Sequence, residues 1–178
     1  MKLTPISLLF LFLIILNISK AEDITQSPIA GKWHLNSELS VELSPWKTYD
    51  LTITTEGNSV TIEQNLSWGR RFFNSSYTLD TTKAENVVHI AMWPDNRHIG
   101  AYTYDHTKIV HATWLDNRRI LRLSTDLNLQ TQQGVRKINI LSDYKVSSSG
   151  SRLTLTELRS TRNIAVEYVF DRVTTTNK

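Results

Sequence analysis

The 178-residue sequence contains no cysteine, only six glycines and four prolines, and little excess charge. Without cysteine the chain has no disulfide, no thiol nucleophile and no thiolate metal site, and it lacks the lipid-attachment cysteine of a bacterial lipoprotein. The formal net charge is only +3. A balance this even gives no reason to expect a polyanionic partner, so we expect no binding to nucleic acid.

The first residues of the chain have the layout of a secretory signal. Lys2 supplies a positive start, residues 6–18 form an apolar run, and small residues stand on both sides of Lys20. This run is shorter than the roughly 20 residues that a membrane-spanning helix needs. We therefore expect residues 1–21 to be a signal peptide cleaved after Ala21, and the protein to be exported to a periplasm or secreted. The mature chain then holds 18 basic and 17 acidic residues.

From Gly31 onward the apolar residues recur at every second position, which is the period of half-buried β-strands. Short polar turns separate about ten such segments; only residues 37–46 resemble a short helix or cap, which Pro45 would end. We predict an all-β domain over residues 22–173, a single antiparallel up-and-down meander. Closure into a barrel of about 8–10 strands would remove its exposed edges. Residues 174–178 are expected to form a frayed tail.

Four hairpin turns can be placed so that apolar residues face apolar residues across the sheet. This tests register, because a one-residue slip moves a whole apolar face to the other side. The turns are Asp116-Asn117, Glu56-Gly57, residues 148–151 and Thr161-Arg162. The resulting pairs are Val110 with Leu123, Ala112 with Leu121, Ile53 with Val60, Leu51 with Ile62, Val146 with Leu153, and Leu155 with Tyr168.

Two motifs at opposite ends of the chain resemble the structural signature of calycins and lipocalins. Gly31-Lys32-Trp33 lies on the first expected strand, and Arg172 ends the last one in YVFDR. Residues 31–53 and the stretch DYKVSSSGSRLTLTELRS are also similar to small exported bacterial lipocalin-like proteins. The resemblance implies that Trp33 and Arg172 pack together across one end of the barrel, and that Gly31 lets the backbone turn tightly into it. It further implies a ligand-holding or interaction barrel, without catalytic residues.

Several aromatic and aliphatic side chains are candidates for lining a ligand cavity if the barrel closes. They are Phe73, Tyr77, Trp114, Leu121, Leu123, Tyr144, Tyr168 and Phe170. Two interpretations remain open: a cavity for a small apolar or amphipathic ligand, or an interior filled by these side chains. Glu157 and Gln64 fall on the same inward face, where each is either a ligand contact or a rim residue in water.

Signatures of catalysis and of metal binding are missing from the sequence. No two of the five histidines form an i, i+2 or i, i+4 pair, no acidic cluster stands beside them, and no G-x-S-x-G motif occurs. We therefore expect no enzyme activity, no metal and no cofactor. Asn65 and Asn74 stand in glycosylation sequons, which matter only in a host that glycosylates exported proteins.

Two alternative functions are considered. The loop from Trp93 to His98 mixes aromatic and basic groups, so the protein could be an interaction module, such as an inhibitor of a secreted enzyme. A small outer-membrane barrel would show the same alternation. Most of the expected strands are shorter than the roughly 9–11 residues that a membrane strand needs, so we expect no membrane insertion.

Overall fold

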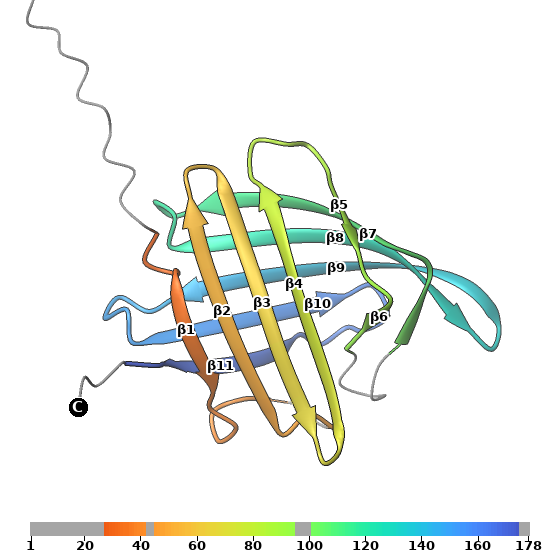
Figure 1. The fold of residues 1–178 in the computed structure, drawn as a ribbon, viewed down its shortest axis with the longest axis horizontal. Coiled ribbons are helices and arrows are strands. Elements are labelled where there is room, and N and C mark those ends of the chain that lie inside the picture. Colours follow the sequence, from red (N-terminus) through yellow and green to blue (C-terminus); the bar gives the residue numbers. More distant parts are fainter. Residues whose placement is uncertain (1–26, 42–44, 95–100, 175–178) are drawn as a thin grey trace, which may run out of the picture.

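Eleven β-strands and no helix make up the part of the chain that the structure, a computed structural model, describes: residues 27–41, 45–94 and 101–174 (Figure 1). The strands are β1 (Gly31–Leu35), β2 (Thr48–Glu56), β3 (Ser59–Trp68), β4 (Arg71–Asp80), β5 (Asn86–His89), β6 (Met92–Trp93), β7 (Ala101–Leu115), β8 (Ile120–Thr131), β9 (Gly134–Val146), β10 (Arg152–Arg159) and β11 (Val166–Arg172). The predicted all-β architecture is confirmed. The described residues contain no helix of the length and apolarity required to cross a membrane.

The strands form one antiparallel sheet that curls into a nearly closed barrel. The order is β4-β3-β2-β1-β11-β10-β9-β8-β7-β5, and β6 pairs with β7 outside this path. The pairing of β1 with β11 joins the first strand of the meander to the last. Strands β4 and β5 end the order, so a seam stays open between them. In Figure 1, β1–β4 cross β7–β11 as two layers of the barrel.

Buried side chains gather in two places inside this sheet. The larger cluster fills the barrel and includes Trp33, Leu51, Ile62, Leu153 and Phe170. A smaller cluster lies toward the far end of the long β8–β9 hairpin and contains Trp93, Leu127, Leu129, Ile138 and Ile140. Because side chains alternate across a strand, the same strands present polar residues to the outside. The β2 burial pattern, with buried Tyr49, Leu51 and Ile53, is typical.

One end of the barrel is closed by Arg172 stacked on Trp33. The Cζ atom of Arg172 lies 4.0 Å from the centroid of the Trp33 ring, and the guanidinium donates hydrogen bonds to the carbonyl oxygens of Pro28, Ala30 and Gly150 at 2.6–2.8 Å. The Trp33 indole nitrogen donates to the Ile29 carbonyl at 3.0 Å. Trp33 and Arg172, which the resemblance to calycins and lipocalins predicts to pack together, are therefore in contact.

Gly31 is required beside this contact. Its φ angle is +146°, and a Cβ atom at this position would lie 2.4 Å from Nη1 of Arg172. Any larger residue would both strain the backbone and push the guanidinium off the Trp33 ring. The first-strand glycine thus makes room for the last-strand arginine.

Two of the four predicted hairpin registers are confirmed. Val146 lies opposite Leu153 in the β9–β10 pair. Leu155 lies opposite Tyr168 in the β10–β11 pair. The connection in the second hairpin spans residues 160–165, so it is longer than the two-residue turn that was predicted at positions 161–162.

The β7–β8 hairpin is shifted by two residues from its predicted register. Its turn covers residues 116–119, of which the first three have positive φ, and the Arg119 amide closes it by donating to the Asp116 carbonyl at 3.0 Å. Leu123 therefore lies opposite Ala112 rather than Val110. A shift of two residues keeps each side chain on its own face of the sheet.

The register predicted for the β2–β3 hairpin is also wrong by two residues. Its turn begins at Gly57, where φ is 56°, rather than at Glu56. Ile62 consequently lies opposite Ile53 instead of Leu51. The inward face is again unchanged, because the shift is by an even number of positions.

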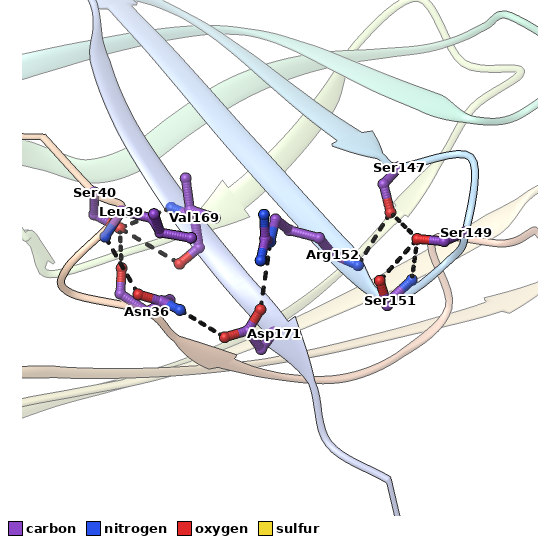
Figure 2. Close-up of polar contacts among 9 residues, drawn as sticks. All are labelled: Asn36, Leu39, Ser40, Ser147, Ser149, Ser151, Arg152, Val169 and Asp171. Atoms are coloured by element: carbon purple, nitrogen blue, oxygen red, sulfur yellow. Dashed lines mark hydrogen bonds and ion pairs between the residues drawn. The ribbon is translucent and has the colours of Figure 1, made fainter.

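The helix or cap expected at residues 37–46 is absent from the described positions 37–41 and 45–46. The chain turns at residues 37–39, and Val41 forms a single bridge with Glu167 of β11. The Ser40 hydroxyl donates to the Asn36 carbonyl at 2.7 Å and accepts from the Val169 amide at 2.8 Å (Figure 2). Side-chain bonds of this kind compete with helix formation, so the segment runs along β11 instead.

Candidate ligand cavity

A small, partly open cavity lies among inward-facing side chains of the barrel. Its volume is about 60 Å³. This is room for about four water molecules, whereas pockets for small ligands measure roughly 300–1,000 Å³. The lining side chains are Tyr49, Gln64, Leu66, Tyr77, Ile90, Trp93, Pro94, Lys108, Leu123, Thr125, Leu127, Ile140, Ser142, Tyr144, Glu157 and Tyr168.

Tyrosine hydroxyls provide much of the polar lining. Gln64 donates its amide N–H to the hydroxyl of Tyr49 and accepts from Ser75 at 3.1 Å. Burial raises the pKa of Tyr49, Tyr77 and Tyr144 above the ordinary value. These hydroxyls therefore stay protonated at physiological pH and can both donate and accept hydrogen bonds.

A buried ion pair stands beside the tyrosines. Nη2 of Arg159 lies 2.7 Å from Oε1 of Glu157, and the two side chains are 2% and 15% exposed. The Arg159 guanidinium also lies 4.6 Å from the centroid of the Trp93 ring. Glu157 is therefore a paired interior group rather than a rim residue, and its charge is matched by Arg159.

Lys108 brings a cation into the lining of the cavity itself. Its Nζ atom lies 3.8 Å from the centroid of the Tyr77 ring. Burial lowers the pKa of Lys108 from 10.5 to about 8, while the negative charge of Glu157 acts in the opposite direction. The lysine reaches this position just after the irregularity in the β7–β8 pairing between Thr103 and Lys108.

Four of the eight predicted cavity residues line this cavity and four do not. Tyr77, Leu123, Tyr144 and Tyr168 face it. The other four lie outside the lining. Phe73, Leu121 and Phe170 are packed in the main core, and Trp114 lies 4.9 Å under the Arg118 guanidinium. That the four lining residues contact a ligand stays a prediction.

Sequence reasoning missed the cations of the site. Arg159 follows Leu155 and Glu157 at intervals of two, and Lys108 precedes Val110 by two, so the alternation places both inward. The loop from Trp93 to His98 was also a candidate site; Trp93 and Pro94 line the cavity, and residues 95–98 lie outside the described residues. In the described ranges no group of three acidic or histidine side chains could hold a metal ion.

A larger, open groove adjoins the cavity at Trp93, which lines both. Its volume is about 690 Å³. Apolar side chains from the smaller core cluster, Leu129 and Ile138, form its floor together with Ala101. Polar residues of the β8–β9 hairpin, including Arg136, stand around it. The groove is thus mainly apolar, while the lining of the cavity behind Trp93 mixes apolar side chains with tyrosine hydroxyls, Gln64, Lys108 and Glu157.

The order of the strands, the closure by β1 and β11 and the seam beside β4 define a calycin-type β-barrel. No protein-family model and no curated protein matches the sequence. Among solved structures, the chain is similar to a Schistosoma mansoni fatty acid binding protein in complex with arachidonic acid, with a TM-score of 0.53 and 12% identity over 83% of this chain and 98% of that one.

The chain is also similar in fold to two further solved structures. Apo lipid binding protein 8 of Caenorhabditis elegans gives a TM-score of 0.52 at 10% identity, over 82% of this chain and 96% of that one. The REP1-NXSQ fatty acid transporter gives 0.50 at 12% identity, with the same coverage. At such identities the similarity establishes the fold of the chain and leaves its ligand to be argued from the site.

Proposed function

We propose that this protein is an exported barrel that binds a small amphipathic molecule at the end of the barrel where Trp93 lies. The observation that carries the proposal is that Trp93 lines both the cavity, which contains the tyrosine hydroxyls, and the mainly apolar groove. The apolar part of the ligand lies on Leu129 and Ile138, and its polar group points past Trp93 toward the tyrosine hydroxyls.

The two volumes support this placement. The cavity of about 60 Å³ is too small for an apolar chain, whereas the groove of about 690 Å³ falls in the range of ligand pockets. The fold supports it as well, since the Schistosoma mansoni protein of the same fold is described as a fatty acid binding protein in complex with arachidonic acid.

Two separate observations support export of the protein and an aqueous environment for the barrel. The signal-like pattern of residues 1–21, which lie outside the described residues, supports export. The outward face of β2 and β3 carries Asp50, Thr52 and Glu63, all polar. A polar outer face and an apolar interior support a barrel in water, since a barrel in lipid has an apolar outer band.

Binding of 11-(dansylamino)undecanoic acid to the purified mature chain tests the proposal. Leu129→Glu or Ile138→Glu places a carboxylate in the apolar floor of the groove, and the cost of desolvating it weakens binding by more than about tenfold. Val135→Glu is the matched control, because Val135 is exposed on the same hairpin and lies outside the groove lining. Its affinity should equal that of the unaltered protein.

Two outcomes would contradict the proposal. The first is no saturable binding of the probe by the unaltered protein. The second is equal weakening by Val135→Glu and Leu129→Glu, which would place the probe on the hairpin surface rather than in the groove. Native mass spectrometry of protein purified from its own host should detect the natural ligand as a co-purifying mass, and this mass should be absent from the Leu129→Glu variant.

A further inference from the structure

The cavity holds a primary amine that has no carboxylate partner. Within the ranges that the structure describes, no acidic oxygen lies within ion-pair distance of Lys108, and its Nζ atom lies over the face of the Tyr77 ring. The nearby carboxylate of Glu157 is engaged by Arg159 at 2.7 Å. With Lys108 protonated, these three side chains carry one excess positive charge.

This surrounding favours the neutral form of the amine. Burial lowers the pKa of Lys108 to about 8, so about a tenth of the lysine is unprotonated at neutral pH, against well under a thousandth of an ordinary surface lysine. The titratable groups that line the cavity with Lys108 are Tyr49 from β2, Tyr77 from β4, Tyr144 from β9, Glu157 from β10 and Tyr168 from β11. On its other side Lys108 shares a small pocket with Asp105, Asp126 and Lys137. The charge that raises the pKa of Lys108 against the effect of burial is that of Glu157.

We propose that Lys108 is a covalent binding site for small aldehydes. The Nζ lone pair adds to the carbonyl carbon, and one N–H proton passes to the carbonyl oxygen, which gives a carbinolamine. Loss of the new hydroxyl group together with the second N–H proton releases one water molecule and leaves an imine. No electrons are gained or lost, and hydrolysis reverses the reaction.

The cavity suits this chemistry in size and in polarity. Its volume of about 60 Å³ accommodates an aldehyde of two or three carbons, since a single water molecule needs roughly 10–15 Å³ of such space. The hydroxyls of Tyr77 and Tyr144 line the same space, and Tyr144 donates a hydrogen bond to Tyr77. Because burial keeps the Tyr77 hydroxyl protonated, its own hydrogen can be donated to the carbonyl oxygen as the carbon is attacked.

Reductive trapping with limiting acetaldehyde and sodium cyanoborohydride at neutral pH tests the site. Peptide mapping should show Lys108 ethylated at least about tenfold faster than the exposed Lys32, because the neutral amine is the nucleophile. Lys32 is an internal control in the same molecules, so the comparison needs no variant. In urea the two rates should become equal.

Two results would overturn the proposal: equal ethylation of Lys108 and Lys32 in the folded protein, or a preference for Lys108 that persists in urea. Without the reductant, the adduct mass should vanish on dialysis, and a mass that remains would contradict an imine. Lys108→Arg should remove the fast site. The inference goes beyond ligand binding in the groove, because Leu129→Glu leaves the cavity lining intact and should still be ethylated at Lys108.

Discussion

The free energy of unfolding should rise with pH between pH 7 and about pH 9.5 because of Lys108. Its pKa is about 8 in the folded protein and 10.5 in the unfolded chain. Between these values the unfolded chain holds a proton that the folded protein has lost. Stability therefore rises with pH across this window, and the Lys108 contribution levels off above pH 10.5.

The magnitude follows from the two pKa values. Each unit of pKa difference corresponds to about 1.4 kcal/mol. Between pH 7 and about pH 9.5, Lys108 therefore raises the free energy of unfolding by about 2 kcal/mol. Tyr49, Tyr77 and Tyr144 act in the opposite direction, because their pKa values are raised in the folded state. Their effect is under about 1 kcal/mol at pH 9.5 and exceeds that of Lys108 only nearer pH 10 and above.

Urea unfolding followed by tryptophan fluorescence measures this effect in the unaltered protein and in Lys108→Met. The variant lacks the titrating amine, so the difference in unfolding free energy between the two proteins should change by about 2 kcal/mol from pH 7 to about pH 9.5, with the unaltered protein gaining. Lys32→Met, at an exposed position, should give a constant difference. A constant difference for Lys108→Met would refute a buried amine with a lowered pKa.

Two further substitutions test the packing at the two ends of the barrel. Gly31→Ala should destabilise the protein by about 2–4 kcal/mol in urea unfolding, because its Cβ meets Arg172; Gly57→Ala, where the space is open, should cost only about 1 kcal/mol, and equal losses would deny the clash. Glu157→Gln should cost about 3–5 kcal/mol by leaving Arg159 without its counter-charge. Adding Arg159→Met should recover most of that loss, and no recovery would refute the pairing.

The barrel could be predicted from the sequence because alternate positions along a strand point to opposite faces of the sheet, so the spacing of the apolar residues alone identifies the inward face. Leu51 and Ile53, two positions apart, face inward whichever turn joins β2 to β3. The length of the turns could not be predicted in the same way. The β7–β8 connection places Asp116, Asn117 and Arg118 at positive φ, and an arginine in that conformation has no recognisable pattern in a single sequence.

The site could be predicted only in part. Tyr77, Tyr144 and Tyr168 were found because an aromatic residue at an inward position is expected in a core. Lys108 and Arg159 occupy inward positions by the same alternation, but charged residues are almost never fully buried unless they are paired. Contacts in the folded structure allow them to lie inside. Arg159 pairs with Glu157 on the same strand, and Lys108 lies on the face of the Tyr77 ring.

The cations that lie wholly or partly inside this barrel differ in how their charges are compensated, and the difference bears on function. Arg172 stacks on Trp33 and donates to three carbonyl oxygens, and Arg159 is matched by Glu157. Lys108 lies on the face of the Tyr77 ring and forms no ion pair within the described residues, although the charge of Glu157 acts on it. A partly buried charge without an ion pair destabilises a protein, and a methionine in its place would avoid that cost. Local rules of this kind are broken mainly at functional sites, so the lysine beside the cavity is the residue from which the ligand chemistry of this protein is best approached.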